Sequence, residues 1–80
     1  MRRLTLYSKP GCHLCDEMKD VIDAVSARVP VSLDVIDITT DRELEARYGL
    51  EIPVLLIDGE KAAKYRVTAA QLERRLVSGR

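Results

Sequence analysis

Cys12-His13-Leu14-Cys15 contains the only two cysteines of the chain and lies where a strand pattern ends and a helix pattern begins. The first amides of a helix lack intrahelical acceptors and stabilise negative charge, so a thiolate at Cys12 is favoured there. One helical turn brings Cys15 under Cys12, near enough for a disulfide and more buried. The spacing therefore predicts a reactive dithiol in which Cys12 attacks a disulfide and Cys15 resolves the product.

Other roles for this cysteine pair are open. A structural disulfide that closes so short a loop would remove little entropy from the unfolded chain, and the sequence shows no secretory signal. A structural zinc ion needs four ligands. One C-x-x-C pair with the lone His13 inside it leaves no second pair of ligands to complete them. A metal or cluster site shared between two chains and a pair of inert cysteines are the remaining alternatives. The C-x-x-C spacing favours redox chemistry over all of them.

Composition predicts one small globular domain over residues 1–80. With 46% hydrophobic residues in 80, the chain can build one core and has no room for a second. The 13 basic and 13 acidic residues balance, so no net field attracts nucleic acid or an anionic membrane. Met1-Arg2-Arg3 leads directly into an alternating segment and not into an apolar signal core. We therefore expect a monomeric, cytoplasmic protein that binds neither nucleic acid nor membrane.

The segments flanking the cysteines have different periodicities. Residues Leu4–Tyr7 alternate between apolar and polar, which predicts a strand, and turn residues at 8–11 lead into Cys12. From Leu14 to Val25, apolar residues recur at helical spacing. The acidic residues between them are typical of a solvated helix face. The cysteine motif is therefore predicted to open an amphipathic helix.

A second strand and a short second helix are expected next. Residues 31–35 alternate as a strand, and Thr40 with Glu43 forms a capping-box signature for a helix that Tyr48-Gly49 ends. Two strands joined by a helix require a crossover connection. They are therefore predicted to be parallel neighbours in a right-handed βαβ unit.

The second half of the chain predicts a hairpin followed by a helix. Residues 54–57 form an unbroken apolar run, as in a central strand covered on both faces. Asp58-Gly59 is a hairpin turn into an antiparallel strand over 60–64. Thr68 and Gln71 form a second capping box, which starts a last amphipathic helix. The predicted order is β-α-β-α-β-β-α, an α/β fold.

Three motifs in this order resemble the glutaredoxins, and most closely the short glutaredoxin-like proteins of bacteria. They are Tyr7-Ser8-Lys9 leading into Cys12-x-x-Cys15, then Ile52-Pro53 at the start of a strand, then the strand-turn-strand-helix finish. The resemblance runs from about Leu4 to Leu76. It implies a thioredoxin-like fold of glutaredoxin type, with a four-stranded mixed sheet flanked by three helices. It also implies a thiol-disulfide oxidoreductase active in electron transport and cell redox homeostasis.

The resemblance further implies substrate-binding roles for residues near the dithiol. Pro53 is expected to be cis and to turn the Ile52 backbone toward an incoming disulfide, the alternative being an ordinary proline at a strand start. Lys9 is similar to the basic residue that stabilises the thiolate or contacts a glutathione carboxylate; the alternative is a solvated loop lysine. A protonated His13 would also favour the thiolate, whereas an exposed histidine of ordinary pKa is mostly neutral at cytoplasmic pH.

No bound cofactor or metal is expected, and glutathione is the candidate co-substrate. Three departures from the glutaredoxin pattern predict weak glutathione binding: His13-Leu14 in place of Pro-Tyr, a like charge at Glu51, and Tyr65-Arg66 where Gly-Gly approaches the γ-glutamyl group. Arg66 and the amides from Thr68 could still contact a carboxylate. The expected partners are a disulfide-containing protein or a glutathione mixed disulfide, and a thioredoxin- or glutathione-type reductant.

Two further functions fit the same fold. The dithiol could hold a metal or an iron–sulfur cluster at a dimer interface in a non-catalytic carrier. It could also act as the sensor of an interaction domain whose partner contacts change on oxidation. The oxidoreductase remains the hypothesis that the motifs favour.

Overall fold

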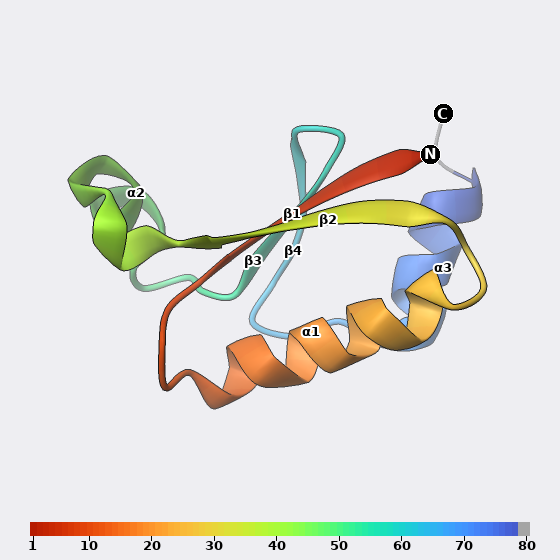
Figure 1. The fold of residues 1–80 in the computed structure, drawn as a ribbon, viewed down its shortest axis with the longest axis horizontal. Helices are drawn as coiled ribbons and strands as arrows, with labels where there is room; N and C mark the ends of the chain where they lie inside the picture. Colours follow the sequence, from red (N-terminus) through yellow and green to blue (C-terminus); the bar gives the residue numbers. More distant parts are fainter. Residues whose placement is uncertain (79–80) are drawn as a thin grey trace.

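The helices and strands occur in the predicted order (Figure 1). The computed structural model describes residues 1–78. Their elements are β1 (Arg2–Ser8), α1 (His13–Ser26), β2 (Val31–Asp37), a 3-10 turn (Ile38–Thr40), α2 (Arg42–Tyr48), β3 (Val54–Ile57), β4 (Glu60–Lys64) and α3 (Ala69–Ser78). The first two strands are longer than the sequence patterns indicated, because the β-ladder also includes Arg2, Arg3 and Ser8 on β1 and Ile36 and Asp37 on β2.

The four strands form one mixed sheet in the order β2-β1-β3-β4. β1 and β2 are parallel, as the crossover argument predicted, with Leu4 opposite Leu33. β1 and β3 are antiparallel, with Leu6 opposite Leu55. β3 and β4 form the predicted antiparallel hairpin, which is interrupted by an irregularity between Leu55 and Leu56. The expected α/β fold is therefore confirmed.

Helices α1 and α3 pack side by side against one face of the sheet, whereas α2 lies beyond the end where β2 finishes (Figure 1). The core between the helices and the sheet consists of apolar side chains that are almost fully buried: Leu4, Leu6, Met18, Ile22, Val25, Leu55, Ile57, Leu72 and Leu76. Each such side chain contributes about 1.5–3 kcal/mol on burial. This core holds α1 firmly and so fixes the position of the cysteines at its start.

The expectation that β3 is covered on both faces holds for most of the strand. Val54, Leu55 and Ile57 are buried, but Leu56 is only partly buried. Leu56 lies on the face opposite the two long helices, across from Thr5 on β1 and Lys61 on β4. Polar neighbours on that face leave the Leu56 side chain partly open to water.

One capping prediction is wrong and the other is confirmed. The Asp41 carboxylate, not Thr40, caps α2 and accepts hydrogen bonds from the Glu43 and Leu44 amides at 2.9 and 3.2 Å. Thr40 belongs to the preceding 3-10 turn, where its hydroxyl donates to the Asp37 carbonyl. A carboxylate that takes two free amides is a strong cap. At α3, the capping box closes as predicted, with Thr68 N–H donating to Gln71 Oε1 and Gln71 N–H donating to Thr68 Oγ1.

Asp58 joins the β3–β4 turn to the start of β1. Asp58 and Gly59 both have positive φ, 51° and 89°, as a tight hairpin turn requires. The Asp58 carboxylate accepts hydrogen bonds from the Arg3 amide at 3.0 Å and from Arg2 Nε at 2.6 Å. The Arg3 amide, followed by Arg2, lowers the pKa of the Asp58 carboxyl.

This geometry predicts that the Asp58→Asn variant loses stability in a pH-dependent way. Because the folded-state pKa lies below the unfolded value of about 3.9, the contribution is complete above that pH and is lost as the pH falls through the folded-state pKa. Urea midpoints of the variant and the parent should therefore differ most near pH 7 and converge in acid. An Asp20→Asn variant on the exposed face of α1 is the matched control. A difference that stays constant from pH 7 to pH 3 would contradict this account.

Candidate redox site

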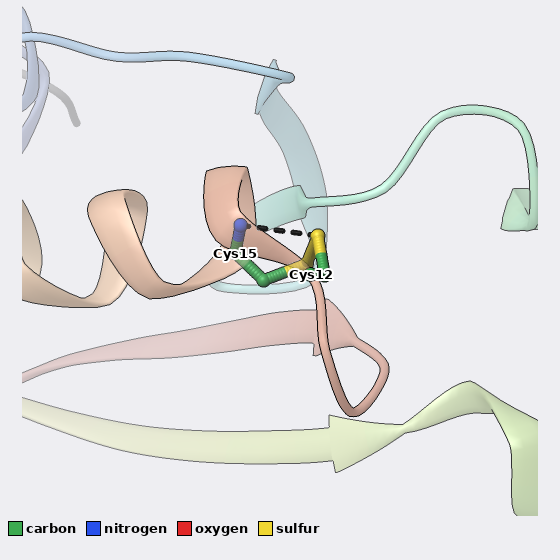
Figure 2. Close-up of a disulfide and its surroundings, with 2 residues drawn as sticks. All are labelled: Cys12 and Cys15. Carbon is green, nitrogen blue, oxygen red and sulfur yellow. Dashed lines mark hydrogen bonds between the residues drawn. A yellow bond between two sulfur atoms is a disulfide. The ribbon is translucent and has the colours of Figure 1, made fainter.

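Cys12 is the residue that caps α1. Its backbone is extended, with φ −96° and ψ 108°, and the helix begins at His13. The Cys15 N–H donates a hydrogen bond to Cys12 Sγ at 3.2 Å (Figure 2). The two sulfurs form a disulfide across a Cα–Cα distance of 5.2 Å. The helix start therefore directs an amide at the Cys12 sulfur, as the sequence predicted.

The loop before Cys12 bends sharply at Gly11. Gly11 has a φ of +77°, in the left-handed region that favours glycine. A side chain would meet no atom within 4 Å there, so the requirement is conformational and not one of space. The bend carries the chain from the end of β1 into α1 and leaves Lys9 exposed on the loop.

The two cysteines differ in accessibility. Cys15 is buried, with 4% of its surface exposed, whereas Cys12 is partly exposed. A reagent or substrate can therefore approach the Cys12 sulfur more easily than the Cys15 sulfur. The burial difference that one helical turn predicts is confirmed.

A second apolar cluster lies behind the dithiol, separate from the main core. Its buried members are Cys15, Ile38 and Ile52. Tyr7, Cys12, Leu44 and Tyr48 pack against them. This cluster joins the end of β1, the helix start, α2 and the segment before β3. It keeps water away from the inner sulfur.

The contact between the two tyrosines of this cluster was not predicted from the sequence. The Tyr7 and Tyr48 rings stack with centroids 4.6 Å apart and an interplanar angle of 17°. The Lys61 ammonium lies 5.9 Å from the centre of the Tyr48 ring. The four-residue spacing of Leu44 and Tyr48 was the only local signal, since it places both side chains on one face of α2.

The Ile52–Pro53 peptide bond is cis, as the resemblance implied. Ile52 packs in the same cluster as Cys15 and is 8% exposed. The Pro53 carbonyl accepts a hydrogen bond from the Tyr65 N–H at 2.9 Å. Within residues 1–78, the Ile52 N–H and C=O have no hydrogen-bond partner. Ile52 therefore offers one backbone donor and one acceptor close to the dithiol.

Tyr65 ties the end of β4 to the loop before Pro53. Its hydroxyl donates to the Leu50 carbonyl at 2.9 Å, and its amide donates to Pro53. The residue adopts a left-handed backbone with φ 69°, which is unusual for a non-glycine side chain and costs on the order of 1 kcal/mol. The two hydrogen bonds offset this cost. No local sequence signal indicated this contact across 15 positions.

The remaining predicted site residues lie at the start of α1 and in the segment that leads into α3. His13 is exposed in the first turn of α1. Arg66 forms an exposed ion pair with Glu17 at 3.5 Å. Thr68 and Gln71 use their own amides in the capping box, so the Ala69 and Ala70 amides are those left at the start of α3. The amide of Thr68 itself is therefore already occupied.

Glu51 forms an ion pair that the sequence did not predict. Its carboxylate accepts a hydrogen bond from Lys61 Nζ at 2.8 Å. This hydrogen bond, together with the charge of Lys61, lowers the pKa of the Glu51 carboxyl. The Lys61 ammonium offsets much of the negative charge that Glu51 would present to an anionic ligand.

A groove of about 420 Å³ lies between α1 and the segment that leads into α3. It is lined by Leu14, Glu17, Met18 and Val21 from α1 and by Tyr65, Arg66, Val67, Thr68 and Gln71 from the other side. Leu14 lies in the first turn of α1, so the groove reaches the start of that helix, although neither cysteine lines it. Sequence periodicity marks Leu14 and Val21 as apolar but does not show that they line an open groove.

Two other kinds of feature are not found in residues 1–78. No group of three or more His, Cys, Asp or Glu side chains is placed to hold a metal ion in this part of the chain. Within the same residues, every helix is too short or too polar to cross a membrane. A metal bound by the cysteine pair would therefore need further ligands from elsewhere.

Comparisons with known proteins agree with this geometry. The crystal structure of XcR50 from X. campestris is 31% identical, has a TM-score of 0.79, and matches over 96% of this chain and 99% of that one. The solution structure of Ne2328 from Nitrosomonas europaea is 27% identical, with a TM-score of 0.81 over 94% and 91% of the two chains. Reduced desulfothioredoxin from Desulfovibrio vulgaris Hildenborough is 26% identical, with a TM-score of 0.70 over 99% and 81%.

The family model for the glutaredoxin-like domain (DUF836) matches residues 3–77. The fold is therefore thioredoxin-like, and this fold together with the cysteine pair indicates a redox function. The chain belongs to the glutaredoxin-like domain family.

Proposed function

We propose that this protein is a thiol-disulfide oxidoreductase that reduces protein or mixed disulfides, with Cys12 as the nucleophile and Cys15 as the resolving cysteine. One observation carries the proposal: the Cys15 amide donates to the sulfur of the more exposed cysteine, Cys12. An amide hydrogen bond and the positive end of the α1 dipole both favour the thiolate over the thiol. The sulfur that is accessible is thus also the one that is activated.

The reaction follows from the positions of the two sulfurs. The Cys12 thiolate attacks one sulfur of the substrate disulfide, and the other sulfur leaves as a thiolate that takes a proton from water. Cys15 then loses its proton and attacks Cys12 Sγ, which releases the second substrate thiolate. Two electrons pass to the substrate, and the Cys12–Cys15 disulfide remains. A dithiol or glutathione-type reductant must restore the dithiol before the next cycle.

The backbone of Ile52 is suited to hold an extended substrate during this attack. Its N–H and C=O are unpaired within residues 1–78, and its side chain packs with Cys15. A substrate strand that pairs with Ile52 would place its disulfide beside Cys12. We assign Lys9 and His13 an electrostatic role, since both are exposed and lie within three positions of Cys12.

The role assignment predicts different outcomes for the two cysteine variants. The Cys15→Ser protein should attack a disulfide and accumulate a mixed disulfide on Cys12, because the resolving thiol is missing. The Cys12→Ser protein should form almost none, because the buried Cys15 lacks both access and the amide contact. Mass spectrometry after acid quenching and alkylation measures the amount of mixed disulfide on each variant. Equal trapping by the two variants, or trapping on Cys15 alone, would reverse the assignment.

Glutathione is predicted to reduce the protein no better than a small protein dithiol does. Tyr65 supplies bulk where a close backbone approach needs glycine, and Arg66 is already paired with Glu17. Steady-state turnover of a glutathione mixed disulfide with each reductant measures the ratio of the two rates. Because glycine tolerates φ 69°, the Tyr65→Gly variant should shift this ratio toward glutathione. Efficient, saturable glutathione-driven turnover by the unaltered protein would refute the prediction.

A further inference from the structure

Tyr65 forms hydrogen bonds on both sides of Ile52. Its hydroxyl donates to the carbonyl of Leu50, two residues before Ile52, at 2.9 Å. Its amide donates to the carbonyl of Pro53, the residue after Ile52, also at 2.9 Å. Within residues 1–78, the Ile52 N–H and C=O have no hydrogen-bond partner. One residue thus holds both ends of the short segment that carries these two unpaired backbone groups.

The hydroxyl contact is what a tyrosine adds at this position. The left-handed backbone of Tyr65, with φ 69°, suits glycine better than a residue with a side chain. The Tyr65 side chain belongs to a residue that is 42% exposed, so burial stabilises it less than a core tyrosine. The contact with Pro53 needs only a backbone N–H. The hydrogen bond to the Leu50 carbonyl is therefore the contact that requires the tyrosine hydroxyl.

The segment that Tyr65 holds packs directly on the cysteine pair. Ile52 is 8% exposed and belongs to the same buried cluster as Cys15, and Cys12 packs against that cluster. Figure 2 shows the segment before β3 passing beside the two cysteines. Backbone groups that are ordered before a ligand arrives bind it more tightly, because less entropy is lost on binding. The Tyr65 contacts supply this order at Ile52.

We propose that Tyr65 is a positioning residue that makes the site selective for disulfides carried on an extended polypeptide. It acts through the Leu50 carbonyl on Ile52, whose N–H donates to a substrate carbonyl and whose C=O accepts from a substrate amide. A small disulfide without a peptide backbone cannot form these two hydrogen bonds and gains nothing from Tyr65. The inference rests on the proposed function, because it names the class of disulfide that the dithiol reduces best.

The test compares two uncharged substrates that differ in their peptide backbone. One is a blocked alanine peptide with a single cysteine, joined through a disulfide to mercaptoethanol. The other is the symmetric disulfide of mercaptoethanol. Pre-reduced protein reacts with each in a single turnover, so that two electrons pass from the Cys12–Cys15 dithiol to the substrate and no further reductant is needed. The rate of substrate reduction is measured for the parent and for each variant.

The Tyr65→Phe variant removes only the hydroxyl. The amide contact with Pro53 and the Lys61–Glu51 hydrogen bond remain, so we expect the variant to fold, and a urea midpoint checks this. It should reduce the peptide disulfide about three- to tenfold more slowly than the parent, the loss expected of one hydrogen bond. It should reduce the mercaptoethanol disulfide at the parent rate.

The matched control is Ser26→Ala at the far end of α1. This variant also removes a hydroxyl that donates to a backbone carbonyl, that of Asp23 at 2.8 Å. Both of its rates should equal those of the parent. A loss of the peptide rate in Ser26→Ala as large as in Tyr65→Phe would assign the effect to stability alone and overturn the inference.

The remaining outcomes separate this inference from the proposed function. Failure of the parent to reduce either disulfide overturns the oxidoreductase and the inference together. A Tyr65→Phe variant that reduces the peptide at the parent rate, or that loses the same factor on both substrates, overturns the positioning role and leaves the oxidoreductase intact. A Tyr65→Phe variant that fails to fold would show that the hydroxyl is structural and would overturn the positioning role as well.

Discussion

The hydrogen bond from the Cys15 amide to the Cys12 sulfur depends on where helix α1 begins. After β1 the chain bends at Gly11, and the helix starts at His13, one residue after Cys12. Met18, Ile22 and Val25 then fix the helix against the sheet, so its first amides keep their direction. The main core of this small protein thus holds the polar start of α1 beside an accessible sulfur.

The segments that pack near the dithiol are held together by contacts between residues far apart in the sequence. Ile52 packs with Cys15, while the Tyr65 hydrogen bonds hold the loop before Pro53 to the end of β4. The stacked Tyr7 and Tyr48 rings support the same cluster from β1 and α2. This arrangement leaves the Ile52 backbone groups available to a substrate while the inner cysteine stays dry. The site therefore combines a partly exposed sulfur that accepts a helix-start amide with the Ile52 N–H and C=O, which have no hydrogen-bond partner within residues 1–78.

Much of the fold could be predicted because the local sequence patterns match the helices, strands and turns that the tertiary structure contains. Alternation gave the first two strands, Asp58-Gly59 gave the hairpin, and the Thr68–Gln71 capping box marked the start of α3. Thr40 was the wrong cap because Asp41, one position later, competes for the same amides. The contact of Tyr65 with Leu50 could not be predicted, since side-chain reach across separate elements leaves no periodic signal. The cysteine motif was visible from spacing alone, but the groove between α1 and the segment that leads into α3 depends on tertiary packing.

The central claim is that the start of α1 activates Cys12, and a titration of its thiol tests this most directly. In the Cys15→Ser protein, where Cys12 is the single cysteine, absorbance of the thiolate near 240 nm is followed against pH. The amide contact and the helix dipole predict a pKa for Cys12 below the value of about 8.5 for free cysteine. A pKa at or above that value would contradict the account, because the helix start would then provide no activation.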